Sequence, residues 1–126
     1  MVTRDKRGGL IAARDSFFVA ASTKTIHTFT MTPNSICKLV VEFVGQRLNN
    51  AAGTSFTSIT TINSTGSTAT VRNGPTDVNS YGAGVTSSIS TSGLDINVRA
   101  VVASGQPWRI AAWIYLYELE QQYAAI

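Results

Sequence analysis

Apolar and polar side chains alternate along most of this chain, with the period of two that places neighbouring residues on opposite faces of a β-strand. The clearest case is 36–48, where Lys38 and Glu42 fall on one face. The opposite face is apolar and consists of Cys37, Leu39, Val41 and Phe43. Turn-forming Asn, Gly and Pro residues separate the alternating segments. The pattern predicts eight strands, at 16–21, 24–32, 36–48, 55–62, 68–72, 85–91, 94–102 and 108–118.

Short strands separated by turns, without a clear helical segment between them, are typical of a β-sandwich. We therefore expect an all-β, jelly-roll-like fold, with two antiparallel sheets packed face to face and an extended N-terminal arm. At 126 residues the chain has the length of one domain. The strongest alternation supplies the expected core, which is Leu39, Val41, Phe43, Ile96, Val98 and Ile114.

Residues 108–118 form the most apolar segment, and two periods fit it. Ile110, Trp113 and Tyr117 match the spacing of a helix, whereas aromatic and β-branched residues directly after a turn favour a strand. We expect a strand as far as Tyr117, followed by a tail or a short helix over 118–126.

As a strand, 108–118 is apolar on both faces and therefore needs two covers. The row expected to face the core is Ile110, Ala112, Ile114 and Leu116. The second row is Trp113, Tyr115, Tyr117 and Leu119. Charged residues make up only 13% of the chain, about half of the ~25% usual for a soluble domain, so much of the surface is neutral. We expect the second row to be the interface of a homo-oligomer.

The net charge of +3 is concentrated in residues 1–14, while the basic and acidic residues of the remaining chain balance. Gly8-Gly9 is followed there by a small apolar pair. A solvated tail and a docking arm both fit this composition, and we expect an arm that docks on an acidic partner. Its contact residues would be Arg4, Lys6, Arg7, Leu10 and Ile11. The expected division is an arm at 1–14, a sandwich domain at 15–119 and a C-terminal tail at 120–126.

Catalytic and ligand-binding chemistry has little support in the sequence. Cys37 and His27 are the only residues of their types and the acidic residues form no close pair within the domain, so neither a metal site nor a catalytic dyad is predicted. No serine has the surroundings of a nucleophile, and no glycine-rich loop has the lysine and helix that phosphate binding requires. We therefore expect a protein that is not an enzyme and holds no cofactor.

The sequence also indicates the compartment and the partners of the protein. A single cysteine and the lack of a secretory signal predict a protein kept in a reducing cytoplasm, or in a particle assembled there. No apolar run is long enough to span a membrane. The basic residues of the domain are scattered, which argues against nucleic acid as a partner.

Residues 93–119, which read GLDINVRAVVASGQPWRIAAWIYLYEL, carry a likeness to a known class. A Gly/Ser turn here leads into a Trp-containing last strand, and the body before it is rich in Ser, Thr, Asn and Gly. In these features the chain resembles small β-sandwich proteins of tailed-bacteriophage particles. The resemblance implies a head-decoration, head-fibre or tail-appendage subunit of the virion. It also implies a homotrimer that contacts other virion proteins, such as the major capsid protein.

A second hypothesis places the function in the loops. The chain would then be a carbohydrate- or receptor-binding module, such as a fibre tip that binds a host glycan, with loops 49–54, 73–84 and 103–107 as its contact surface. The aromatic residues near the C-terminus, Trp108, Trp113, Tyr115 and Tyr117, are a candidate platform for sugar stacking. The two hypotheses differ in whether residues 1–14 or the loops are essential.

Overall fold

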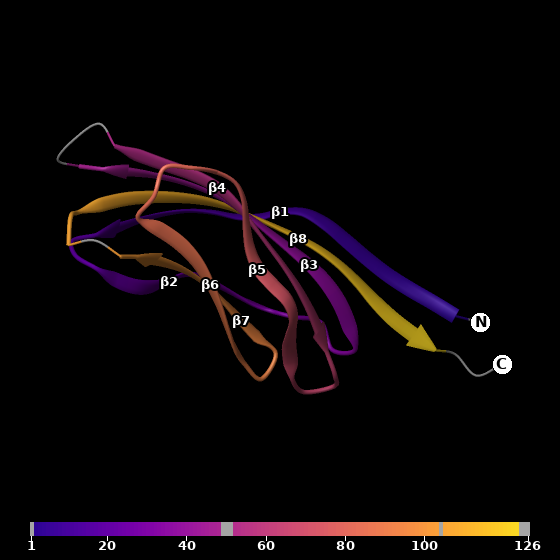
Figure 1. Cartoon of the computed structure of the whole chain (residues 1–126). Coiled ribbons are helices and arrows are strands. Elements are labelled where there is room, and N and C mark those ends of the chain that lie inside the picture. Colours follow the sequence, from indigo (N-terminus) through magenta and orange to yellow (C-terminus); the bar gives the residue numbers. More distant parts are fainter. Residues whose placement is uncertain (1, 49–51, 104, 124–126) are drawn as a thin grey trace.

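The computed structural model describes the backbone of residues 2–48, 52–103 and 105–123, and the side chains of 8–48, 52–103 and 105–120 (Figure 1). The described residues form strands and turns without any helix. The strands are β1 (Val2–Phe18), β2 (Ser22–Thr30), β3 (Ser35–Arg47), β4 (Gly53–Ser64), β5 (Ala69–Tyr81), β6 (Val85–Ser92), β7 (Asp95–Val102) and β8 (Trp108–Tyr123).

These strands make two antiparallel sheets. The large sheet has five strands in the order β1-β8-β3-β4-β5, and the small sheet has three in the order β2-β7-β6. Strands from opposite ends of the chain are therefore neighbours, because β8 lies between β1 and β3, and β7 lies between β2 and β6. The expected fold class, an all-β antiparallel sandwich of two sheets, is confirmed.

The core lies between the sheets and is built by the alternation read from the sequence. In β3, buried and exposed positions follow one another along nearly the whole strand, because successive side chains point to opposite faces. All six expected core residues are at most 1% exposed: Leu39, Val41, Phe43, Ile96, Val98 and Ile114. Cys37 is buried beside them, as a small apolar residue. The rings of Phe43 and Phe56 stack at 4.7 Å between centroids.

Residues 2–14 do not leave the domain as an arm; they are the N-terminal part of β1. The expected first strand, 16–21, therefore begins much earlier and ends at Phe18. β1 pairs with β8 from Val2 opposite Tyr123 to Phe18 opposite Trp108, with one irregularity between Leu10 and Ala12. The physical reason is the edge of β8, whose backbone groups need hydrogen-bond partners that the basic segment provides. The domain boundaries expected at 14/15 and 119/120 thus fall inside β1 and β8.

The helix considered for the C-terminal segment is wrong, since β8 is a strand that continues to Tyr123. Residues 124–126 of the expected tail lie outside the described part of the chain. The strand end expected at residue 72 is also wrong, because β5 continues through Asn73-Gly74-Pro75 with shifted register. Gly74 permits this with a φ of 91°, and a Cβ there would lie 2.4 Å from the Ile59 carbonyl oxygen of β4.

Candidate interaction surfaces

β8 divides its side chains between two very different environments. The inward row, Ile110, Ala112, Ile114 and Leu116, is at most 3% exposed and packs between the sheets. The outward row contains Trp113, Tyr115, Tyr117 and Leu119, the residues expected at an oligomer interface. Trp113, Tyr115 and Leu119 are half-buried by their neighbours within the sheet, and Tyr117 is 48% exposed. We call this side of the large sheet the outer face; no described element packs over it.

Neighbouring strands extend the outward row of β8 into an apolar surface. Opposite residues of an antiparallel pair share a face, so Tyr115 lies between Leu10 of β1 and Val40 of β3. Val40 in turn lies opposite Ile59 of β4. One apolar row therefore crosses four strands of the large sheet. Further large side chains on this face are Ile36 and Val44, each about half exposed.

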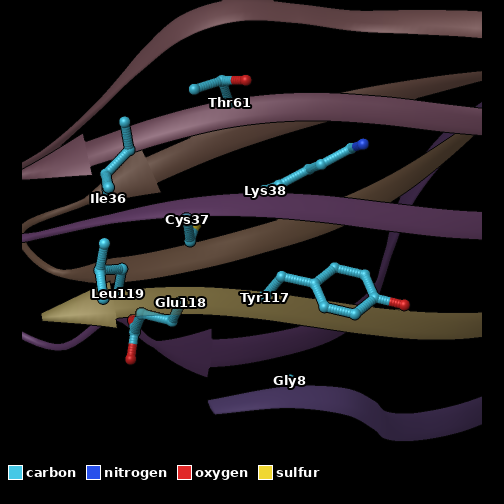
Figure 2. A pocket seen from close by; sticks show the side chains of 8 residues that line it. All are labelled: Gly8, Ile36, Cys37, Lys38, Thr61, Tyr117, Glu118 and Leu119. Atoms are coloured by element: carbon cyan, nitrogen blue, oxygen red, sulfur yellow. The ribbon is translucent and has the colours of Figure 1, made fainter. Parts of the chain in front are cut away.

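A groove of about 620 Å³ runs over the outer face near the ends of β3 and β8 (Figure 2). Tyr117 and Lys38 extend side by side along it, while Ile36 and Leu119 lie further along the same strands. Gly8 of β1 lies opposite Tyr117, and a Cβ on this glycine would be 2.8 Å from the Tyr117 ring. Glycine at this position therefore leaves room for the aromatic ring against β1.

Charged side chains of both signs lie on the outer face. Lys38 and Glu42 lie on β3 to either side of the apolar row at Val40. Asp15 and Arg109 form an exposed ion pair, in which the Arg109 Nε donates to the Asp15 carboxylate at 3.0 Å. This hydrogen bond lowers the pKa of Asp15, and the same contact raises the pKa of Arg109.

The residues expected to dock as an arm lie on β1 within the same sheet. Arg4, Lys6 and Arg7 are opposite Gln121, Leu119 and Glu118 in register, and the side chains of these three basic residues lie outside the described part. Leu10 and Ile11 are 54% and 42% exposed at the irregularity of β1. The structure thus brings Leu10 and the expected interface residue Tyr115 together, although the sequence analysis assigned them to different regions.

Ile36, Val40, Val44 and Ile59 were missed as outer-face residues by the sequence analysis. A signal for three of them existed, since Ile36, Val40 and Val44 recur every fourth residue on the charged side of β3. Ile59 had no such signal, because its place beside Val40 depends on the pairing of β3 with β4.

Loops meet at the other end of the sandwich, which we call the loop end. The expected loop 73–84 shrinks to 82–84, because β5 continues to Tyr81; of the expected loop 49–54, residues 49–51 are outside the described part. Here a hollow of about 750 Å³ is lined by Arg47, Ala52, Gly53, Tyr81, Gly82, Ala83, Gly84 and Trp108. The four aromatic residues expected to form a sugar-stacking platform do not share one surface: Trp108 is 2% exposed on the inner face, whereas Trp113, Tyr115 and Tyr117 are on the outer face.

Two further titratable residues, His27 and Glu118, are held by contacts within the fold. His27 is half-buried against Phe29, and burial, followed by the charge of Arg14, lowers its pKa. Glu118 points inward at 5% exposure, and its carboxylate accepts hydrogen bonds from the backbone N and Oγ1 of Thr32. Among the described residues no group of three or more His, Cys, Asp and Glu side chains could hold a metal ion. Nor does the described part contain a helix long and apolar enough to cross a membrane.

This chain is similar to several solved structures. No protein-family model matches this sequence, and no curated protein does either. The tailspike protein of Acinetobacter baumannii phage AM24 gives a TM-score of 0.47 at 8% identity, over 96% of this chain and 28% of that one. Tailspike gp49 of A. baumannii bacteriophage Fri1, described as a capsular polysaccharide depolymerase, gives 0.41 at 18% identity over 90% and 17%. The tailspike of Acinetobacter phage vB_ApiP_P1 gives 0.40 at 14% identity over 93% and 22%.

This chain therefore spans less than a third of each of these tailspike proteins. Likeness at TM-scores below 0.5 assigns neither a family nor a function to this chain.

Proposed function

We propose that this chain is a non-catalytic structural module of a bacteriophage particle and that it self-associates through the outer face of its large sheet. The observation that carries the proposal is the second face of β8. That face has the large apolar and aromatic side chains of a subunit contact, and no described element of its own chain covers it.

Another copy of the chain is the occupant that the charges of this face favour. Lys38 and Glu42 stand on opposite sides of the apolar row at Val40. In a contact between copies, the Lys38 of one copy can compensate the Glu42 of another while the apolar rows meet. A strongly basic or acidic partner would leave one of these two charges without compensation.

The role within the particle follows from the resemblance in residues 93–119. We expect a capsid-decoration, head-fibre or tail-appendage subunit, a homotrimer that is assembled in the host cytoplasm and becomes part of the virion. Contact with other virion proteins, such as the major capsid protein, would involve the start of β1 with Arg4, Lys6 and Arg7. This segment lies beside the end of β8 at one end of the molecule (Figure 1).

Light scattering of the purified protein at micromolar concentration tests self-association. Three copies of the 13.4 kDa chain give a mass of about 40 kDa. A mass of 13.4 kDa at all accessible concentrations would contradict the proposal. Cryo-electron microscopy of the parent particle tests the second part, since the sandwich should be visible in symmetric clusters on its surface.

A further inference from the structure

The hollow at the loop end is held by hydrogen bonds between segments far apart in the sequence. The amide of Leu48 donates to the Pro107 carbonyl at 3.1 Å, and that of Ala103 donates to the Gly84 carbonyl at 3.1 Å. The Thr54 hydroxyl donates to the Tyr81 carbonyl at 2.9 Å. These bonds fix the rim of the hollow without a ligand, which reduces the entropy cost of binding.

Two glycines bring the backbone close to the floor of the hollow. Gly82 has a φ of 77°, and a Cβ there would lie 2.2 Å from the Gly53 carbonyl oxygen. Gly84 has a φ of 103°, and a Cβ there would lie 3.0 Å from the Trp108 ring. Larger residues would displace the loop from Trp108 and fill the hollow.

Arg47 is the charged residue that lines this hollow. It lies opposite Trp108 in the β3–β8 pair, and no acidic side chain lines the hollow with it. Its Nε is buried and has no hydrogen-bond partner among the described residues. Since a buried donor without a partner costs free energy, the guanidinium has an unmet demand for an acceptor. A carboxylate meets that demand best, because it accepts two parallel hydrogen bonds from an arginine.

Tyr81 supplies a second kind of contact at the rim. It is 74% exposed, which leaves its ring and hydroxyl available to a ligand. Aromatic rings stack on the apolar faces of sugar rings, and their hydroxyl groups bind the sugar's own. The volume of about 750 Å³ is within the range of ordinary ligand sites.

We infer that the loop-end hollow binds a saccharide that bears a carboxylate, with Arg47 pairing to the carboxylate and Tyr81 stacking on the ring. The hollow is separate from the groove on the outer face: Arg47 and the groove residue Ile36 stand at opposite ends of β3, about 36 Å apart.

Isothermal titration calorimetry with tri-galacturonate and tri-glucuronate tests the inference, with neutral maltotriose as the matched ligand. We expect binding of an acidic trisaccharide that falls at least about tenfold in Arg47→Gln, since hydrogen bonds to a charged group are worth that much. Tyr81→Ala should also weaken binding, and this exposed position leaves the fold intact even if Arg47→Gln does not.

Arg99→Gln is the matched control. Its Nε is likewise buried without a described partner, but Arg99 lies on β7 of the small sheet and does not line the hollow. The control should retain the affinity of the wild type. The inference would be overturned by equal binding of maltotriose, by an unchanged affinity in Tyr81→Ala, or by the absence of heat with both acidic trisaccharides.

Discussion

β8 contacts two environments with side chains of similar hydrophobicity. Toward the inside, Ile114 and its neighbours are sealed between the sheets, where each buried methylene contributes about 0.8 kcal/mol to folding. Toward the outside, Tyr115 and Tyr117 lie in an equally apolar row that keeps substantial contact with solvent. The difference lies in what the rest of the chain supplies: the small sheet covers one face, and no described element covers the other. The inner face therefore maintains the fold, and the outer face is available for a partner.

The largest expected effect is on the inner face. Ile114→Ala should lower the free energy of unfolding by roughly 2–5 kcal/mol, because the cavity adds to the lost transfer free energy. Urea denaturation followed by tryptophan fluorescence measures it. The adjacent variant Tyr115→Ala, compared at concentrations where the protein is monomeric, should cost clearly less. Equal losses at the two positions would remove the distinction between the faces.

Self-association, in contrast to folding stability, should depend on the outer face. Tyr117→Asp places a charge in the outer face and should weaken association by roughly tenfold or more, because the charge would be buried without a partner. Sedimentation velocity over a range of concentrations measures this change, and the unfolding midpoint of the monomer should stay nearly the same. Thr86→Asp, an exposed position on β6 of the small sheet, is the matched control and should associate as the wild type does. Dissociation by both variants would point to a general effect of charge.

A smaller effect is expected at Gly8. In Gly8→Ala the new methyl group meets the Tyr117 ring at 2.8 Å and should rotate it into the groove. The free energy of unfolding should change by no more than about 1 kcal/mol, since the lower entropy of the unfolded chain offsets the shift. Association should weaken measurably by sedimentation velocity. Gly66→Ala, where a Cβ would meet nothing within 4 Å, is the control, and an equal change there would argue against the groove.

The smallest expected effects concern pH, and they involve one group on the outer face and one at the margin of the small sheet. The Arg109 guanidinium holds the pKa of Asp15 below its ordinary value, and burial lowers the pKa of His27. Both groups therefore bind protons more weakly in the folded protein, so acid favours unfolding. The loss from His27 should begin as the pH falls below about 6.5, and that from Asp15 only below about 3.9.

Thermal unfolding across this pH range separates the two contributions. His27→Gln should flatten the decline between about pH 6.5 and 5, and Asp15→Asn should flatten the decline only in the more acidic range. Stability that rises as the pH falls below 6.5 would contradict the sign derived for His27.

Much of the fold was predictable from the sequence, because a strand's period is a local property. Whether Cys37 and Lys38 point to opposite faces depends only on the pleat of β3, and a core built from such rows follows directly. The continuity of β5 was not predictable in this way. Gly74 and Pro75 look like a break, and only the approach of β4 to Gly74 shows why the strand continues.

The candidate sites were likewise predictable only where they depend on local alternation. The doubly apolar character of 108–118 was visible in the sequence, and so was the apolar pair Leu10 and Ile11. Their meeting on one surface was not visible, because residues 2–14 have the composition of a basic arm until the unpaired edge of β8 recruits them. The hollow at the loop end was even less predictable from the sequence. Its residues Arg47, Tyr81 and Trp108 come from three distant segments that share no sequence pattern.

The sequence by itself determined the class of fold, the core of the sandwich and the second apolar face of β8, because each depends on the alternation of neighbouring side chains. The tertiary structure alone decided which edge β1 would occupy, which apolar face would stay uncovered and which loops would meet around Arg47. Those outcomes depend on pairing between strands far apart in the chain, where backbone hydrogen bonds and packing outweigh local preference.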